Sequence, residues 1–418
     1  MEMHENKQSP ELALLVSVDT GDYDAERSLA ELEELAKTAG AEVFGKLIQK
    51  RQKPDNATFV GSGTLEQIKD ICEKNALDLL IFDNELSPSQ IRNIEKATDT
   101  RVVDRTMLIL DIFALRANTS EGKLQVELAQ LQYMLTHLTG KGVEMSRLGA
   151  GIGTRGPGES KLESDRRHIR RRIQALKEDL KALQKRRDIH RKQRAKRGVT
   201  IVAIVGYTNT GKSTLLNTLT GAGVLAQNQL FATLDPTARA LKLPNGGEVM
   251  LVDTVGFVSR LPHMLVEAFK STLEEAAFAD IILNICDASS PEFEDQLRIT
   301  KEILQELGAA EKTIIDVFNK CDLAEALFDL PEHRDSVKIS ALKGIGIDAL
   351  LEKIEEHLPA AKKRVRLLLP FSLGWVVAGI RKDGVLIREE FTDDGILIEA
   401  IVDIVFLNTI QQYIISEN

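Results

Sequence analysis

The chain has 418 residues, a mass of 46.3 kDa and a formal net charge of −9, and 43% of its residues are hydrophobic. This length predicts about two to four domains. The three scattered cysteines exclude a disulfide framework and favour a reducing, cytoplasmic location. The chain does not begin with a signal-peptide pattern. Its longest apolar run, residues 367–380, contains Pro370 and is too short to cross a bilayer, so we expect no membrane span.

The first 120 residues alternate between strand-like and helix-like segments, which predicts an N-terminal domain with a parallel α/β sheet. For the glycine-containing turn at residues 60–64, we favour a plain tight turn over a contact with phosphate. The expected strands are at residues 12–18, 42–49 and 79–83, and the expected helices are at residues 24–39, 64–74 and 87–98.

Two amphipathic stretches follow. In residues 126–138 and 169–183, apolar side chains recur at three- and four-residue steps, as one face of a helix requires. They predict an antiparallel helical hairpin over residues 121–197. Between Lys161 and Arg197 there are 16 Lys or Arg and 5 Asp or Glu, a net charge of +11. A solvated charged face is one interpretation. The mutual repulsion of so many cations favours a polyanionic partner.

The segment between the two predicted helices, residues 140–158, contains seven glycines. It includes a formal G-x-G-x-x-G pattern, but no strand precedes it, so we reject dinucleotide binding. A long loop with cations and few Cβ atoms suits entry into folded RNA, and a linker without a role is the alternative. The predicted RNA contacts are Lys141, Arg147 and Arg155 in this loop and Arg166, Arg167, Arg170 and Arg171 on the second helix.

The stretch Gly206–Ser213 has the form G-x-x-x-x-G-K-[ST] and directly follows a strand-like run at residues 200–205. A strand that opens into a helix through two glycines aims backbone N–H groups and the helix N-terminus at one point, which favours phosphate. Lys212 would reach the β- and γ-phosphates, and the Ser213 hydroxyl would bind Mg²⁺. The predicted phosphate-binding residues are Gly206, Tyr207, Thr208, Asn209, Thr210, Gly211, Lys212, Ser213 and Thr214.

Three further motifs, each after a strand-like run, identify the nucleotide as GTP. Asp253–Gly256 supplies an acid near Mg²⁺ and a glycine N–H that faces the γ-phosphate. In Asn319–Asp322, the Asp322 carboxylate accepts both donors of the guanine edge, whereas adenine presents only one donor there. Ser340–Leu342 fits the backbone contact to the guanine oxygen. The predicted residues on the base side are Asn319, Lys320, Asp322, Ser340, Ala341 and Leu342.

We place this GTP-binding domain, a doubly wound and mostly parallel sheet, at residues 198–360 and a linker at residues 360–363. Residues 364–418 are expected to form a small C-terminal α/β domain. Its expected strands are at residues 385–387 and 396–401, and its expected helix is at residues 404–415. The predicted fold class of the whole chain is therefore α/β, with the helical hairpin between two α/β domains.

The chain resembles the HflX family over nearly its whole length, most specifically between Val103 and Arg167. Residues 231–237 stand in the place of switch I, the segment that senses the γ-phosphate. The segments that carry the resemblance are residues 103–106, 108–114, 121–131, 156–160, 162–163 and 165–167.

The resemblance implies a bacterial, cytoplasmic GTPase of the Obg–HflX superfamily that binds the 50S subunit, with the hairpin loop near the peptidyl transferase centre of 23S rRNA. It implies that the GTP form dissociates stalled or idle 70S ribosomes under heat or antibiotic stress. Thr64 stands where the family usually carries Lys, which weakens any ATP site in the N-terminal domain. We expect a monomer. Two alternatives stay open: a GTPase of large-subunit assembly, and a nucleotide-gated rRNA-binding or hibernation module with incidental turnover.

The catalytic residues also follow from the resemblance. It gives Thr233 the role of a Mg²⁺ ligand and γ-phosphate sensor, together with Ser213 and Asp253 at the metal and with Gly256 and Lys212 at the γ-phosphate.

One position departs from Ras-like enzymes. Phe257 follows the Asp253–Gly256 motif where a Ras-like enzyme carries a water-orienting Gln, and a phenyl ring cannot position water. Either a partner such as the ribosome reorders the segment around this motif, called switch II, or a K⁺ ion held near Asn209 compensates for the missing Gln. Stabilisation of the loop is the alternative role for Asn209.

Overall fold

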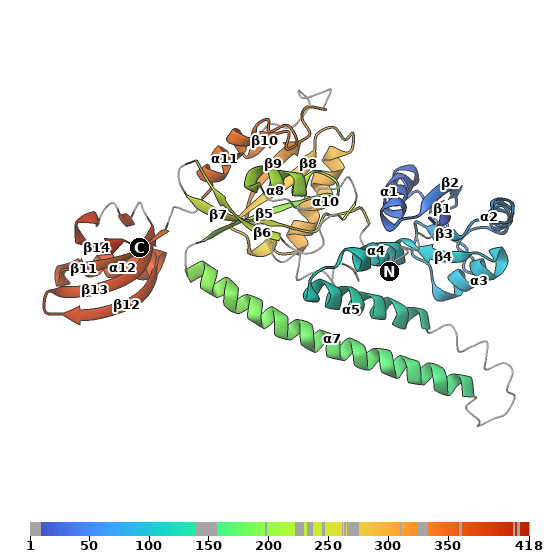
Figure 1. Cartoon of the computed structure of the whole chain (residues 1–418), viewed down its shortest axis with the longest axis horizontal. Helices are drawn as coiled ribbons and strands as arrows, with labels where there is room; N and C mark the ends of the chain where they lie inside the picture. Colours follow the sequence, from blue (N-terminus) through green and yellow to red (C-terminus); the bar gives the residue numbers. More distant parts are fainter. Residues whose placement is uncertain are drawn as a thin grey trace, which may run out of the picture. The chain divides into compact units, whose positions relative to one another are not determined.

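Figure 1 shows the computed structural model of the chain. The chain divides into two compact units, which we describe separately. The first contains residues 1–181, 227–235 and 258–270, and the second contains residues 182–226, 236–257 and 271–418. Among the described helices, none is long and apolar enough to cross a membrane. The structure describes residues 10–138, 157–196, 199–221, 230–231, 237–244, 247–260, 262, 265, 276–309, 311–323, 333–358, 362–403, 406–407 and 410–417.

Four parallel strands form the sheet of the first unit, in the order β2-β1-β3-β4. This confirms the predicted parallel α/β fold. Helices α1 and α4 pack against each other, as do α2 and α3. The strands are β1 (Leu12–Asp19), β2 (Glu42–Lys50), β3 (Leu79–Phe82) and β4 (Arg101–Asp104), and the helices are α1 (Ala25–Ala39), α2 (Ser62–Asn75), α3 (Pro88–Thr98) and α4 (Arg105–Arg116).

Local sequence sets where these helices begin and end. The Asp24 carboxylate accepts a hydrogen bond from the Arg27 N–H and caps α1, which ends at Gly40 with a left-handed φ of 93°. Ser87 and Gln90 form a capping box at the start of α3. The helices then cover the two central strands, β1 and β3, which are almost entirely buried and present apolar side chains on both faces.

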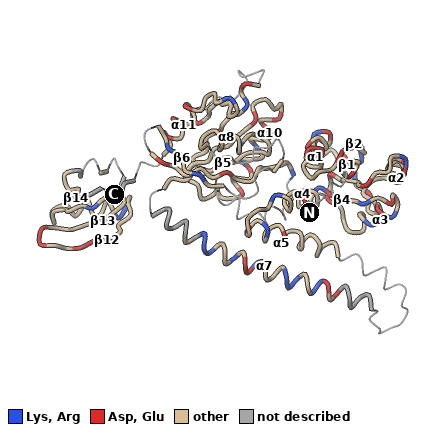
Figure 2. Tube along the Cα trace, in the orientation of Figure 1, with Lys and Arg blue, Asp and Glu red and all other residues tan. Residues whose placement is uncertain are grey.

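The predicted helical hairpin is present, and α5 and the first part of α7 belong to the same unit. Helices α5 (Ser120–His137) and α7 (Pro157–Lys196) pack through buried Leu128, Ile173 and Leu176. A two-pronged ion pair between Arg172 and Glu127, with N···O distances of 2.7 and 2.9 Å, also joins them. Figure 2 shows the concentration of Lys and Arg along α7.

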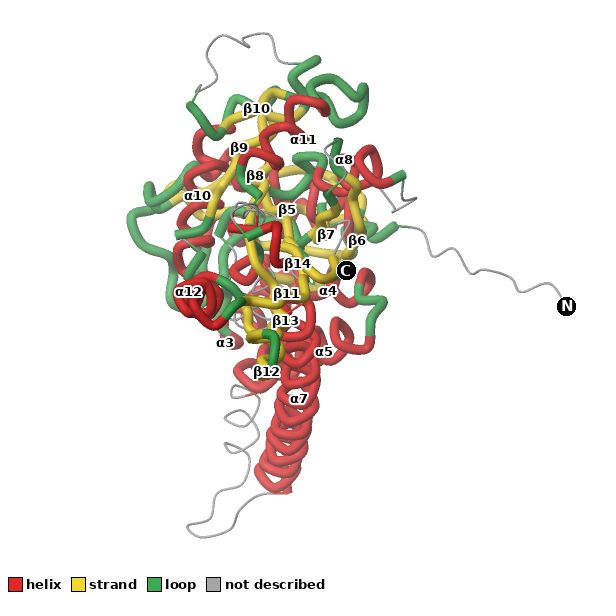
Figure 3. The backbone as a smooth tube through the Cα atoms, turned by 90° about the vertical axis from the view of Figure 1, so that its left-hand side faces the viewer, coloured by secondary structure: helices red, strands yellow, loops and turns green. Residues whose placement is uncertain are grey.

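In the second unit, a six-stranded sheet has the order β10-β9-β8-β5-β7-β6, and only β6 is antiparallel to its neighbour. This confirms the predicted doubly wound, mostly parallel sheet, which Figure 3 shows with its helices. The strands are β5 (Thr200–Gly206), β6 (Thr237–Lys242), β7 (Glu248–Asp253), β8 (Ile281–Asp287), β9 (Thr313–Asn319) and β10 (Ser336–Lys338), and the helices are α8 (Lys212–Thr220), α10 (Phe293–Glu306) and α11 (Ile347–Glu356).

The C-terminal residues form an antiparallel sheet in the order β12-β13-β11-β14, with helix α12 (Gly374–Asp383) packed against it. Its short helical turns are η3 (Phe371–Leu373) and η4 (Gln411–Tyr413). The strands are β11 (Lys362–Leu369), β12 (Val385–Thr392), β13 (Gly395–Asp403) and β14 (Ile414–Glu417).

Two expectations for this region are wrong. The expected linker at residues 360–363 overlaps β11, which begins at Lys362. The second is the expected helix at residues 404–415. In the described part of this range, residues 411–413 form the short turn η4, and Ile414 and Ile415 belong to β14, where Ile414 pairs with Leu367. Burial against the sheet and β-branched isoleucines favour the strand, and these tertiary contacts override the apolar helical spacing that the sequence shows.

The contact between α5 and α7 gives a test of the hairpin. Leu176 is fully buried between the two helices, so we expect Leu176→Ala to lower the free energy of unfolding by about 2–5 kcal/mol. The matched control is Leu115→Ala, at a leucine that is 67% exposed, with an expected effect within about 0.5 kcal/mol. Urea unfolding followed by circular dichroism measures both. Equal effects of the two variants would contradict the packing described here.

Candidate functional site

The loop between β5 and α8 has a backbone that only glycine permits at two positions. Gly206 has a φ of 145°, and a Cβ there would lie 2.2 Å from the Ile285 carbonyl oxygen. Gly211 has a φ of 93°, and a Cβ there would lie 2.3 Å from the Asn319 side-chain nitrogen. Asn209, between them, is exposed and left-handed with a φ of 61°. The loop therefore turns sharply from the strand into the N-terminus of α8, a geometry that suits an anion.

Lys212, the first residue of α8, is buried inside this loop. Its ammonium group donates to the carbonyl oxygens of Gly206 at 3.1 Å and Tyr207 at 2.6 Å. Burial lowers the pKa of Lys212 to about 8, while the nearby Asp253 carboxylate acts in the opposite direction. A buried ammonium group whose pKa is lowered in this way gains a stronger partner when a phosphate enters the loop.

Ser213 and Asp253 come together from two elements. The Ser213 hydroxyl donates to a carboxylate oxygen of Asp253 at 3.0 Å, and Asp253 is fully buried at the end of β7. A hydroxyl beside a carboxylate offers the oxygen ligands that Mg²⁺ prefers, and Mg²⁺ usually takes only one or two protein ligands together with phosphate and water. Thr233, the third expected ligand, lies outside the described residues.

The Asp253–Gly256 motif reaches the phosphate loop. A Cβ at Gly256 would lie 2.8 Å from the Lys212 ammonium nitrogen and 3.0 Å from the Thr208 Cα. The next residue, Phe257, extends the contact: its N–H donates to the Gly206 carbonyl at 3.1 Å, and its carbonyl accepts from the Thr208 N–H at 2.6 Å. The phenyl ring is 1% exposed. Phe257 is therefore part of the core beside the loop.

Asn319 connects the base-side motifs to the phosphate loop. Its side-chain amide donates to the Thr210 carbonyl at 2.8 Å, and its side-chain oxygen accepts from the Ala341 N–H at 2.9 Å. Both partners are buried backbone groups. The structure thus places the Asn319–Asp322 and Ser340–Leu342 motifs beside the end of the Gly206–Ser213 loop.

Asp322, the expected guanine acceptor, lies at this edge with a lysine partner. A hydrogen bond from Ser340 and a 3.0 Å ion pair with Lys343 hold the pKa of the Asp322 carboxyl below its usual range. The carboxylate is therefore ionised at neutral pH and able to accept two donors. Leu342, in the same loop, is 83% exposed.

Two charged residues at this edge, Asp287 and Lys343, have no signal in the sequence. Lys320 forms a 2.6 Å ion pair with Asp287, which ends β8, and Lys343 pairs with Asp322. Neither Asp287 nor Lys343 belongs to a motif. Only the pairing of β8 with β9 and the fold of the loop after β10 place them at this edge.

The expected RNA contacts divide into two groups. Arg167, Arg170 and Arg171 are exposed on α7, and Arg166 is half-buried. Arg172, in the same run, instead binds Glu127 of α5. Lys141, Arg147 and Arg155, with the rest of the glycine-rich loop, lie outside the described residues.

The turn before α2 has internal partners. The Gln49 side chain accepts from the Gly61 N–H at 2.8 Å and donates to the Thr64 hydroxyl at 2.6 Å. These bonds give the turn a structural explanation that requires no phosphate.

Comparison with known proteins gives a consistent family match. Residues 26–114 match the family described as GTP-binding GTPase N-terminal, residues 116–194 match GTP-binding GTPase Middle Region, and residues 201–320 match 50S ribosome-binding GTPase. The chain is 49% identical to GTPase HflX of Caldanaerobacter subterraneus, over 99% of this chain and 96% of that protein. The chain belongs to the HflX family of GTPases.

A second curated relative agrees with this assignment. The chain is 40% identical to GTPase HflX of Escherichia coli, over 94% of this chain and 93% of that protein. It is also 28% identical, with a TM-score of 0.44, to the crystal structure of a GTP-binding protein from Sulfolobus solfataricus in complex with GDP, over 83% of this chain and 98% of that chain. As a member of the HflX family, the protein binds GTP and GDP and hydrolyses GTP.

The environment of Lys212 predicts how nucleotide affinity depends on pH. A bound phosphate raises the pKa of Lys212 above its free value of about 8, so GTP binding takes up a proton where the free lysine is neutral. We expect affinity to be constant below pH 7 and to fall by up to about tenfold per pH unit above pH 8. Calorimetry at pH 8.5 in buffers of different ionisation enthalpy measures the uptake. Binding without proton uptake at that pH would contradict this assignment.

The position of Asp322 predicts base specificity. Asp322→Asn replaces one acceptor by a donor, so we expect GTP affinity to fall by about 100-fold or more, while xanthosine triphosphate affinity rises. Titration with fluorescent nucleotides measures both. Asp348→Asn, at an exposed aspartate in the first turn of α11, is the control and should change neither affinity. An unchanged preference for GTP in Asp322→Asn would show that another group reads the base.

Proposed function

We propose that this HflX-family GTPase binds the large ribosomal subunit in its GTP form, dissociates stalled or idle 70S ribosomes, and leaves after ribosome-stimulated hydrolysis. The observation that carries the proposal is the combination of a GTP site with a strongly basic helical hairpin in one chain. The match of residues 201–320 to the 50S ribosome-binding GTPase family supports the choice of partner. On this proposal the protein works in the cytoplasm as a monomer, during heat or antibiotic stress.

In the proposed site, the chain's own groups orient the nucleotide. Backbone N–H groups of the Gly206–Ser213 loop and the Lys212 ammonium hold the β- and γ-phosphates. Asp322 and the Ser340–Leu342 loop hold the guanine. Ser213, Asp253 and Thr233 would hold a Mg²⁺ ion, which neutralises phosphate charge when bound.

The slow GTP hydrolysis that we expect of the free protein follows from Phe257. Its ring is buried and its backbone is hydrogen-bonded to the phosphate loop, so it cannot turn to orient a water molecule. We therefore assign the missing catalytic contribution to the ribosome, which acts on switch II, with a K⁺ ion at the exposed Asn209 as an additional cation.

The proposed RNA surface begins with the exposed arginines of α7. The guanidinium groups of Arg167, Arg170 and Arg171 are available to phosphates, because Glu127 engages Arg172 and no ion pair of the described residues neutralises Arg170 or Arg171. A guanidinium nitrogen of Arg167 lies 4.0 Å from a carboxylate oxygen of Glu163. This exposed ion pair contributes little free energy. With Arg166 and the cations of residues 141–155, this surface would approach 23S rRNA near the peptidyl transferase centre.

GTP hydrolysis with and without purified 50S subunits, in K⁺ buffer, tests the proposal. We expect 50S to raise the steady-state rate by about two orders of magnitude or more, and added salt to reduce the stimulation because phosphate contacts release counterions. Without stimulation by 50S, the ribosome-activated GTPase is excluded, and tight 50S binding alone would leave an RNA-binding module.

A charge variant connects the stimulation to the hairpin. Arg167→Glu combined with Arg170→Glu and Arg171→Glu should lose most of the 50S stimulation and keep the basal rate. The control replaces Arg298, Arg381 and Arg388, exposed arginines outside the hairpin, by Glu. Sucrose-gradient analysis of 70S particles distinguishes dissociation from subunit assembly, because an assembly GTPase would leave mature 70S particles intact.

A further inference from the structure

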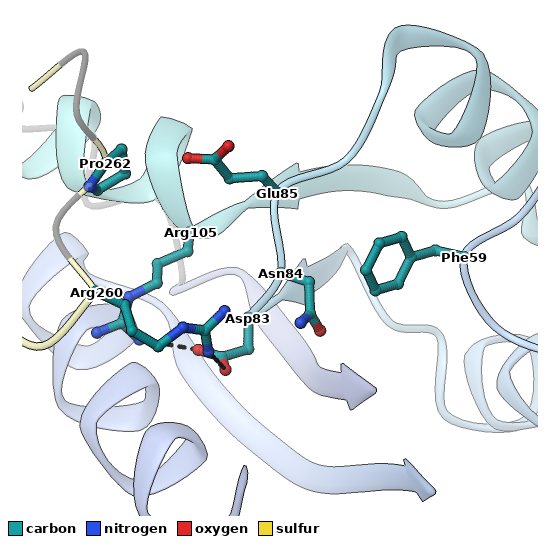
Figure 4. Close-up of a pocket in the computed structure, with 7 residues that line it drawn as sticks. All are labelled: Phe59, Asp83, Asn84, Glu85, Arg105, Arg260 and Pro262. Atoms are coloured by element: carbon teal, nitrogen blue, oxygen red, sulfur yellow. Dashed lines mark hydrogen bonds and ion pairs between the residues drawn. The ribbon is translucent and has the colours of Figure 1, made fainter. Parts of the chain in front are cut away.

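Charged side chains of this protein are paired in two different settings. In the first compact unit, Arg105 and Arg260 donate to Asp83 at 2.8 and 2.7 Å, and all three residues line a cavity of about 360 Å³ (Figure 4). None of these three residues belongs to a nucleotide motif. In the GTP-binding domain, by contrast, the Asn319–Asp322 motif supplies one member of each of two ion pairs, and a residue outside the motifs supplies the other. The first of these outside partners is Asp287, which ends β8.

Asp287 lies at the carboxyl edge of the sheet, directly beside Asn319, which ends the neighbouring strand β9. One of its carboxylate oxygens accepts from the Ser289 N–H at 3.0 Å and from the Ser289 hydroxyl at 2.6 Å. The other accepts from the Lys320 ammonium group at 2.6 Å. The side chains of Asp287 and Lys320 are 16% and 26% exposed, so solvent screens this ion pair less than the exposed pairs on α10.

The backbone of Lys320 is fixed as firmly as its ammonium group. Lys320 has a φ of 62°, a left-handed conformation that a residue with a Cβ keeps only where its surroundings hold it. The carbonyl before Lys320 accepts from the Ala288 N–H at 2.8 Å, and the N–H after it donates to the Ile339 carbonyl at 3.0 Å. Both ends of the Lys320 side chain are therefore held, and its four-carbon stem runs from the end of β9 to Asp287 at the end of β8.

The stem of Lys320 lies over the carboxyl edge of the sheet, where a doubly wound fold binds its ligand. Asp322 stands in the turn that begins at Lys320, because the Leu323 N–H donates to the Lys320 carbonyl at 2.9 Å. A base whose edge donates to Asp322 thus passes close to the stem. Methylene groups that an ion pair holds at their far end offer an ordered apolar surface to a planar ring. Without that ion pair, the stem would lose conformational freedom when the base binds, and this loss weakens binding.

We propose that Asp287 is a positioning residue for the nucleotide: it holds the Lys320 ammonium group, so that the Lys320 stem covers one face of the base whose edge Asp322 reads. Because GTP and GDP carry the same base, Asp287 contributes equally to the binding of both nucleotides. The proposal rests on the binding of GTP and GDP by the HflX family and is independent of any ribosomal role.

The second ion pair of the motif shows what Asp287 does not control. Lys343 pairs at 3.0 Å with Asp322, the expected acceptor of the guanine edge, and that edge distinguishes guanine from xanthine. The Lys320 stem meets a face of the ring, and guanine and xanthine share this apolar face. Asp287 therefore sets how tightly the nucleotide binds, and the choice of base stays with Asp322.

The test uses Asp287→Asn in the full chain without ribosomes. Asn keeps an oxygen for Ser289 and is common in such turns, so this variant should remain folded. Its amide nitrogen then faces the Lys320 ammonium group, and two donors cannot bond each other. We expect the affinities for GTP and GDP to fall by the same factor, about fivefold, which is the effect of leaving one long side chain unordered. The KM for GTP should rise by that factor without a matching fall in kcat.

A Lys320→Met background separates positioning through Lys320 from any other role of Asp287. Met keeps an unbranched stem but has no ammonium group, so Asp287→Asn should cause no further loss of affinity in that background. Asp287→Glu, which keeps the carboxylate, should recover most of the wild-type affinity. Asp295→Asn, which breaks an exposed pair with Arg298 on α10, is the matched control and should bind both nucleotides like the wild type. Titration and dissociation of fluorescent GDP and of a fluorescent GTP analogue measure all of these.

The same fivefold loss in the Lys320→Met background would overturn the proposal, because Asp287 would then act without Lys320. Unchanged affinities in Asp287→Asn would overturn it as well. Competition with xanthosine triphosphate provides a second readout, since the preference for GTP should be the same in Asp287→Asn and the wild type. A weaker preference for GTP would mean that the substitution disturbs the turn that carries Asp322 and that the ion pair is structural only.

Discussion

The nucleotide site depends on two hydrogen bonds made by the side-chain amide of Asn319. It joins the Thr210 carbonyl to the Ala341 N–H, so one buried group fixes the phosphate loop and the loop after β10 at the end of β9. Without Asn319, both buried backbone groups would lack these partners, which costs more than an ordinary hydrogen bond contributes. Gly211 follows from the same constraint, because a Cβ there would collide with the amide nitrogen of Asn319.

The charges of two buried cationic side chains, Lys212 and Arg105, are balanced in different ways. The difference explains why one is a lysine and the other an arginine. Lys212 lies against backbone carbonyls, and burial lowers its pKa, so it is ready for an anionic ligand. Arg105 cannot lose its proton, and it is balanced by Asp83 and Glu31 instead. Lysine therefore stands where charge has to arrive with the ligand, and arginine stands where the charge is already neutralised within the fold.

Local patterns were enough to predict the two parallel sheets and the hairpin, because apolar periodicity and helix caps such as Asp24 and Ser87 act over a few residues. The same reasoning failed at residues 404–415, where pairing of Ile414 with Leu367 decides the structure. It also gave no sign of the bonded charges Glu31, Asp83, Arg105 and Arg260, which are far apart in sequence and belong to no motif. Contacts of this kind depend on the tertiary fold.

The division of the chain into compact units does not follow the borders of the nucleotide motifs. Residues 227–235 and 258–270, which flank the γ-phosphate motifs, belong to the unit that contains residues 1–181, although the phosphate loop belongs to the other. That first unit also contains α5, the first part of α7 and their shared core of Leu128, Ile173 and Leu176. The segment Ser259–Arg260 is therefore held by Glu31 and Asp83 within the unit that carries the exposed arginines of α7.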